Sequence, residues 1–174
     1  LSKKLHYKNG EADALNTYGE VFHFMGDYPG ALRMQFKALQ MNREMKDARR
    51  EAETLGLIGI VYNELGEYRQ ALKYLLPANK IFRELPGNFE GSFELSNTGD
   101  AYDFLNMRDS ALYYQRQAYE KFTDTARPHL KSFILTHMGT TYFELGNKDS
   151  ALKFYNATIL NSLRANDKIN LSVV

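Results

Sequence analysis

The hydrophobic pattern of this chain repeats every 40 residues, and each set of equivalent positions keeps one type of side chain. The repeated positions are Leu15, Leu55, Leu95 and Leu135; Gly19, Gly59, Gly99 and Gly139; Phe22, Tyr62, Tyr102 and Tyr142; and Ala31, Ala71, Ala111 and Ala151. A period of this length is typical of repeat proteins, in which each unit buries its apolar face only against its neighbours. We therefore expect a stack of four similar units.

The spacing inside each unit predicts two helices. In the second unit Leu55, Gly59, Tyr62 and Gly66 follow at intervals of four, three and four residues, which places them on one helical face. A second apolar stripe follows, and a glycine between the two stripes can adopt the left-handed conformation that ends a helix. The corresponding turns fall at residues 25–27, 65–67, 105–107 and 145–147, with Asn106 in place of glycine in the third. Asparagine tolerates this conformation next best.

The small and aromatic positions have separate mechanical roles in this interpretation. Gly19, Ala31 and their equivalents let the two helices of a unit approach closely, whereas larger side chains would hold them apart. The aromatic positions fill the space between successive units. Tyr18, Val21 and Met25 are also apolar, and we expect them to meet the neighbouring unit.

The pattern Leu15-x3-Gly19-x2-Phe22-x8-Ala31-x6-Ala38 and its three copies resemble the signature of the tetratricopeptide repeat. The resemblance implies an all-α fold, a right-handed α-solenoid of stacked helix–turn–helix units. We place the units at residues 11–46, 48–85, 88–125 and 128–166. Residues 1–10 would be the tail of a preceding repeat and residues 168–174 the start of a fifth unit, as expected for a fragment of a longer protein.

In this family one strip of the first helices lines a concave groove that binds peptides or proteins, and the resemblance assigns that role to the matching positions here. Those positions are Asn16, Glu20, His23 and Phe24; Asn63 and Glu64; Asp100, Asp103 and Phe104; and Thr136, Thr140, Phe143 and Glu144. The expected site is therefore a surface for a protein or peptide ligand.

Charge is expected to be distributed unevenly, although the whole chain carries a formal net charge of only +1. Residues 12–25, 52–66, 92–106 and 132–146 contain eight acidic residues and no lysine or arginine, so the rest of the chain carries +9. We expect an acidic concave side and basic outer helices. Family members that clamp the terminal carboxylate of a peptide use cations in the groove, so a basic or amphipathic segment fits this groove better than an acidic one.

Catalytic and metal-binding motifs are weak in this sequence. It contains no cysteine, no glycine-rich phosphate-binding loop, and no nucleophile in a recognisable motif beside a base. Glu20 and His23 are three residues apart and could supply two metal ligands, but the spacing offers no third ligand. We expect no catalysis, no cofactor and no metal. The near-neutral charge argues against a nucleic-acid partner, and no stretch approaches the roughly 18 apolar residues that span a membrane.

The functional resemblance is greatest to the repeat regions of bacterial sensor histidine kinases and related signalling proteins. The first hypothesis is therefore a sensory or interaction segment of a signal-transduction protein, in which a bound ligand changes the pitch of the superhelix. The alternatives are a constitutive scaffold and a regulatory segment of an enzyme whose catalytic domain lies elsewhere. The compartment stays open between the cytoplasm, which we favour, and the periplasm.

Overall fold

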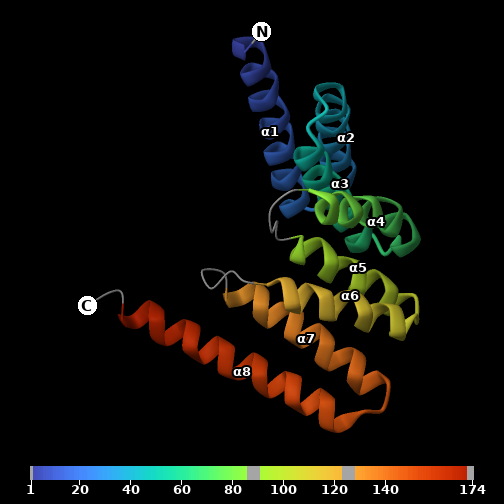
Figure 1. Ribbon diagram of the computed structural model, residues 1–174, viewed down its shortest axis with the longest axis vertical. Coiled ribbons are helices and arrows are strands. Elements are labelled where there is room, and N and C mark those ends of the chain that lie inside the picture. The colour runs from blue at the N-terminus through green and yellow to red at the C-terminus, as the bar shows by residue number, and fades with distance from the viewer. Residues whose placement is uncertain (1, 86–90, 123–127, 172–174) are drawn as a thin grey trace.

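The computed structural model describes residues 2–85, 91–122 and 128–171, and every regular element within these ranges is an α-helix. The helices are α1 (Ser2–Phe24), α2 (Tyr28–Met45), α3 (Ala48–Glu64), α4 (Tyr68–Glu84), α5 (Ser92–Phe104), α6 (Arg108–Lys121), α7 (Pro128–Glu144) and α8 (Lys148–Leu171) (Figure 1). They follow one another as four hairpins, and the direction of the helices turns progressively from α1 to α8.

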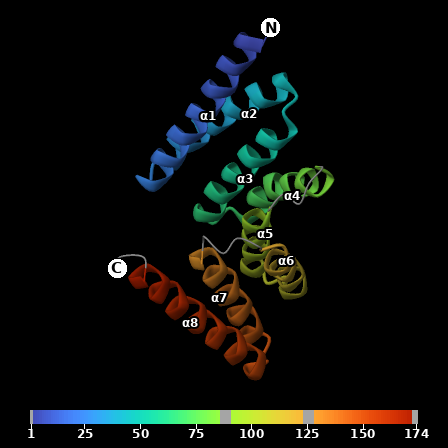
Figure 2. The ribbon, with the colours of Figure 1, turned by 60° about the vertical axis from the view of Figure 1, so that its left-hand side comes forward.

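The hairpins stack in two layers. α1 packs on α2, α3 on α4, α5 on α6 and α7 on α8, and each hairpin also contacts the next. The odd-numbered helices contact one another in succession, whereas the even-numbered helices make no such contact among the described residues. The odd-numbered helices therefore form the inner layer and the even-numbered helices the outer layer, as the rotated view shows (Figure 2). The predicted all-α solenoid is confirmed.

The two terminal helices are longer than the sequence pattern predicts. Residues 2–10 do not form a separate tail but are the first part of α1, because Gly10 has no left-handed φ and nothing else there ends the helix. α8 likewise continues to Leu171 past the expected boundary at residues 166–168, since residues 148–171 contain neither glycine nor proline. Residues 172–174 lie outside the described ranges, and the division into repeat units stays a prediction.

The close approach of paired helices at the glycine positions is confirmed. A Cβ atom added to Gly59 would lie 2.5 Å from Leu75 Cγ and 3.3 Å from the carbonyl oxygen of Ala71, both on α4. The same crowding recurs at the other three glycines, against Gln35, Gln115 and Tyr155 of the partner helices. Leu75 and Ala71 are fully buried, so neither can move aside without opening the core.

The aromatic positions stack within the second, third and fourth hairpins, and the prediction that they fill the space between units is only partly right. Tyr62 stacks on Tyr74 with ring centroids 5.4 Å apart, and Tyr102 stacks on Tyr114 at the same separation. Tyr142 and Phe154 repeat the arrangement in the fourth hairpin. The partner ring stands 12 residues further along the chain, on the face of the second helix that meets the first. Tyr62 also packs against a cluster that reaches back to Leu39 of α2.

The turns between the helices of each hairpin take the expected conformation. Gly26, Gly66 and Gly146 have φ angles of 78°, 74° and 77°. Asn106 occupies the third turn with a φ angle of 60°, so asparagine does replace glycine there without changing the turn. These four turns bring the C-terminal end of each odd-numbered helix and the start of its partner to one edge of the hairpin.

Substituting Gly59 by alanine should lower the free energy of unfolding by about 1–3 kcal/mol, because the added methyl group overlaps a buried leucine. Gly10→Ala is the matched control: a Cβ atom there meets nothing within 4 Å, so the variant should gain up to about 1 kcal/mol of helix propensity. Denaturant unfolding followed by circular dichroism measures both changes. Equal stability of the two variants would contradict this account of the hairpin.

Candidate functional site on the inner seam and the turn edge

The two asparagines expected in the groove join successive units. The Asn16 side-chain amide donates to Thr54 Oγ1 of α3 at 2.8 Å, and that of Asn63 donates to the backbone oxygen of Asn97 on α5 at 2.9 Å. We call this line of contacts between successive odd-numbered helices the inner seam. Each asparagine keeps a buried Oδ1 atom that no described residue bonds. Their amide nitrogens are therefore occupied, and one acceptor on each remains.

Several of the acids that were expected to make the groove negative are neutralised by arginines. Arg50 Nε lies 2.9 Å from Asp13 Oδ1, and Arg49 Nε lies 2.9 Å from Glu53 Oε1. Both arginines stand at the start of α3, a few residues outside the segment that the sequence analysis found free of cations. The missed signal was their reach, because Arg49 pairs with an acid one turn along its own helix and Arg50 with an acid on α1.

A buried acid and a histidine face each other across the third and fourth hairpins. Asp100 of α5 is nearly inaccessible, and its Oδ1 atom lies 2.5 Å from Nδ1 of His137 on α7. Burial lowers the pKa of the His137 imidazole, but the contact with Asp100 and the charge of Asp103 outweigh it and raise the pKa above its ordinary value of 6.5. Burial raises the pKa of Asp100, with His137 acting in the opposite direction. The sequence analysis assigned His137 no role.

Arg108 ties the third turn to the end of α7. Its Nη1 atom lies 2.9 Å from Asp103 Oδ1, and its second nitrogen forms an ion pair with Glu144. The same guanidinium donates to Asn106 Oδ1 at 3.1 Å. Asp103 and Glu144 are therefore brought together as predicted, but by a cation that lies between them.

The two threonines of the predicted groove lie beside α8. Thr140 Oγ1 is 3.2 Å from the hydroxyl of Tyr155, and Thr136 Oγ1 is 3.5 Å from Thr158 Oγ1. Both threonine hydroxyls also donate to backbone oxygens of their own helix. They face the partner helix of their own hairpin.

The remaining predicted residues lie where the odd-numbered helices end. Phe24, Phe104 and Phe143 are 85%, 63% and 58% exposed. Glu20 and Glu64 are exposed and form no ion pair with any described residue. We call residues 20–28, 60–69, 100–109 and 140–149 the turn edge. It carries nine acidic and three basic residues, and its other exposed large apolar side chains are Val21, Met25, Leu65, Met107 and Leu145.

Two contacts connect the turns of successive hairpins into a continuous surface. The ring of Phe104 stacks on Tyr68 of α4 with centroids 4.6 Å apart, which joins the second and third turns. The ion pair of Arg108 with Glu144 joins the third and fourth. The turn edge of the last three hairpins is therefore one surface, apolar at the phenylalanines and acidic around them.

The contacts of His23 and the exposure of the apolar residues near the end of α1 differ from what the sequence pattern predicts. His23 contacts the rings of Phe24 and Tyr28, with centroids 5.6 and 5.8 Å away. Tyr18 and Met25 do not meet a neighbouring unit but are 61% and 75% exposed, and Val21 is exposed as well. In the fourth unit the equivalent of Val21 is Thr141, and it faces the preceding hairpin, because it bonds with Gln115 of α6. Among the described elements α1 contacts only α2 and α3, so Val21 has no preceding hairpin to meet.

Two searches of the described residues bear on the expected chemistry. No group of three or more His, Asp or Glu side chains there is arranged to hold a metal ion. No helix within the same ranges is long and apolar enough to cross a membrane.

The Asp100–His137 pair should make stability depend on pH. Below pH 6.5 the imidazole is charged in both the folded and unfolded chain, so its stabilisation is complete; it is lost as pH rises through the raised folded pKa. The raised pKa of Asp100 changes stability in the same direction, so the free energy of unfolding should fall with rising pH. His137→Asn should flatten the fall above pH 6.5, measured by urea unfolding at several pH values, and Asp100→Asn should do the same. An unchanged slope in both variants would contradict the pairing.

Comparison with known proteins identifies the repeats. One model of the tetratricopeptide repeat matches residues 10–84, and a second model of this repeat matches residues 134–159. A comparison with curated proteins gave no match.

Solved structures share the fold at low sequence identity. BtubC (BKLC) from P. vanneervenii matches 89% of this chain with a TM-score of 0.78 and 16% identity. The apo form of RapI matches 91% with a TM-score of 0.81 and 20% identity, and aspartyl phosphate phosphatase F from Bacillus subtilis matches 95% with a TM-score of 0.81 and 17% identity. The match covers 64%, 58% and 43% of those chains, so this chain spans less than two thirds of each. The protein therefore contains tetratricopeptide repeats, at residues 10–84 and 134–159, and its described helices form the α-solenoid that such repeats build.

Proposed function

We propose that this chain is a non-catalytic repeat domain that binds a basic or amphipathic segment of another protein on its turn edge. The observation that carries the proposal is the row of exposed phenylalanines, Phe24, Phe104 and Phe143, at the ends of the odd-numbered helices. Large exposed apolar patches on a folded protein mark interaction surfaces. A row that includes the first, third and fourth hairpins suits an extended partner.

Charge selects the kind of partner. The turn edge has three times as many acidic as basic residues, and Glu20 and Glu64 have no ion pair with any residue the structure describes. Arg49 and Arg50 are already paired with acids, so they offer little to an acidic peptide. A helix with one apolar and one basic face would place its apolar side chains on the phenylalanines and its cations beside the free glutamates.

The proposal moves the binding surface away from the centre of the predicted groove. Asn16, Asn63, Asp100 and Asp103 contribute to contacts between hairpins, so they would position the inner layer. Glu20, Phe24, Glu64, Phe104 and Phe143 would contact the ligand. His23 would support Phe24, against which it lies.

We place this binding domain in a signal-transduction protein, as the sensory or interaction segment of a histidine kinase or a related protein. The inner seam includes polar contacts such as those of Asn16 and Asn63, so a ligand that spans several turns could alter the angle between hairpins. Such a change in superhelix pitch would pass to a partner domain. A constitutive scaffold is the alternative, and small-angle scattering with and without ligand separates the two, since a scaffold keeps its pitch.

A second candidate is the regulatory segment of an enzyme. The observation that favours it is the likeness of fold to a protein named aspartyl phosphate phosphatase F, which is named as an enzyme. In that case the turn edge would still bind a protein segment, and the chain alone would show no turnover.

A synthetic amphipathic helix of leucine and lysine should bind this chain at least tenfold more tightly than the same helix with glutamate in place of lysine. Phe104→Ala and Phe143→Ala should each weaken that binding about tenfold or more, because burying a phenylalanine contributes about 1.5–3 kcal/mol. Glu20→Lys and Glu64→Lys should weaken it several-fold at low salt and less at high salt. Fluorescence anisotropy of the labelled peptide measures each affinity.

The matched control is Glu120→Lys, which reverses an exposed charge on α6, outside the turn edge. It should bind the leucine–lysine helix as the wild type does. The proposal fails if the glutamate-containing helix binds equally well, or if Glu120→Lys weakens binding as much as Glu64→Lys does.

A further inference from the structure

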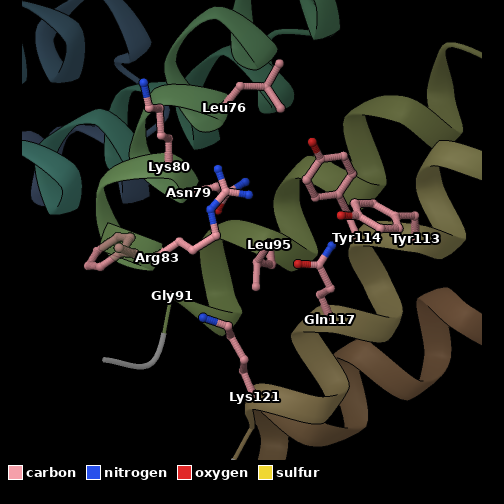
Figure 3. Close-up of a pocket in the computed structure, with 11 residues that line it drawn as sticks. Leu76, Asn79, Lys80, Arg83, Gly91, Leu95, Tyr113, Tyr114, Gln117 and Lys121 are labelled. Atoms are coloured by element: carbon pink, nitrogen blue, oxygen red, sulfur yellow. The ribbon is translucent and has the colours of Figure 1, made fainter. Parts of the chain in front are cut away.

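A small pocket lies on the outer layer, between α4, α6 and the start of α5 (Figure 3). Its volume is about 90 Å³. The lining residues are Leu76, Asn79, Lys80, Phe82, Arg83, Gly91, Leu95, Tyr113, Tyr114, Gln117 and Lys121. Its basic residues Lys80, Arg83 and Lys121 lie in the C-terminal halves of α4 and α6, which are the ends opposite the turn edge.

The charged residues that the structure describes in the pocket lining are all basic. They are Lys80, Arg83 and Lys121. Within the described chain none of these three side chains forms an ion pair, whereas Arg49, Arg50 and Arg108 all do. Burial raises the pKa of the Tyr114 phenol, whereas the positive charge of Arg83 acts to lower it. The guanidinium of α4 therefore interacts electrostatically with the α6 wall of the pocket. Like charges that line one pocket repel one another, and an anion in the pocket would relieve that repulsion.

Two buried polar atoms in the pocket wall have no partner among the described residues. They are Asn79 Oδ1 and Gln117 Nε2. Thr98 Oγ1 donates to the backbone oxygen of Glu94 and so accepts from Asn79 Nδ2 at 2.7 Å, which fixes the amide of Asn79 with its oxygen free. An unsatisfied buried donor or acceptor costs about 1–3 kcal/mol. Both atoms are covered in this structure, so a ligand that accepts from Gln117 and donates to Asn79 would remove both costs once these side chains turn toward it.

The size and chemistry of the pocket together limit the ligand. A volume of about 90 Å³ is sufficient for a single oxyanion group. A carboxylate can accept hydrogen bonds but not donate one, whereas a phosphate that retains a proton does both. Arginine also suits the geometry of phosphate oxygens, because its planar fork donates two parallel bonds.

We propose that this pocket binds a phosphate group, with Arg83 and Lys121 holding its negative oxygens, Gln117 donating a hydrogen bond to it, and Asn79 Oδ1 accepting a hydrogen bond from its P–OH group. Lys80 would add charge from the rim. The group would come either from free inorganic phosphate or from a phosphorylated side chain of a partner, since the recognition chemistry is the same. Figure 3 shows the side chains of Arg83 from α4 and Gln117 from α6 on opposite sides of Leu95.

Calorimetric titration of the full chain with inorganic phosphate tests the proposal, with sodium chloride of equal ionic strength as the baseline. Phosphate should bind saturably, and Arg83→Gln and Lys121→Gln should each weaken binding about tenfold, the usual loss for a hydrogen bond to a charged group. Lys73→Gln, an exposed lysine on the same helix but outside the pocket, is the matched control and should bind as the wild type. Heat indistinguishable from that of chloride, or an equal loss in Lys73→Gln, would overturn the proposal.

Gln117→Leu separates binding from folding. Because it removes a donor that has no partner in the ligand-free chain, this variant should be at least as stable as the wild type by denaturant unfolding, yet bind phosphate more weakly. Unweakened binding in this folded variant would contradict the assigned geometry.

Two further ligands distinguish the sources of the phosphate. Acetate should bind at least tenfold more weakly than phosphate, and equal binding of acetate would overturn the role given to Asn79. N-acetyl phosphoserine amide should bind at least as tightly as inorganic phosphate if a phosphorylated partner is the source, and more weakly if the free ion is.

Discussion

The close approach of two helices at one glycine is the constraint on which the rest of this structure depends. At Gly59 the backbone of α3 comes so near to α4 that even a methyl group would overlap Leu75. This approach fixes the separation and crossing of the two helices, and therefore also sets Tyr62 against Tyr74 one turn away. The close approach at the glycine recurs in all four hairpins, so one local contact repeated every 40 residues builds the array.

The sequence was sufficient to predict the hairpins but not the ends of the array. Recurring leucines and glycines report which residues are equivalent, and the glycine turns with Asn106 were predictable from conformational preference alone. The lengths of α1 and α8 were not, since no repeated position marks where a helix continues past its unit. The aromatic rings were partly misplaced for a related reason: periodicity shows that Tyr62 is buried but not which helix it stacks on.

The candidate site was harder to predict because charge acts across units. The sequence placed Asp13, Asp103 and Glu144 in segments without cations, and that count was correct. It could not show that Arg50 and Arg108, from just outside those segments, reach these acids on neighbouring helices. Pairing between units depends on the distance across the stack, which a single unit does not encode. The exposed phenylalanines could be located more easily from the sequence, because they lie just before the turns.

The near-neutral total charge conceals two surfaces of opposite sign. α4 begins at the turn edge with Tyr68 and reaches the basic pocket at Arg83, 15 residues later, which a rise of 1.5 Å per residue converts to roughly 22 Å. That distance exceeds the Debye length of about 10 Å at 0.1 M salt, so each surface attracts its own ligand with little interference from the other. The two proposed sites, the acidic turn edge and the cationic pocket, therefore lie at opposite ends of α4. A ligand at one of them would leave the charge of the other available.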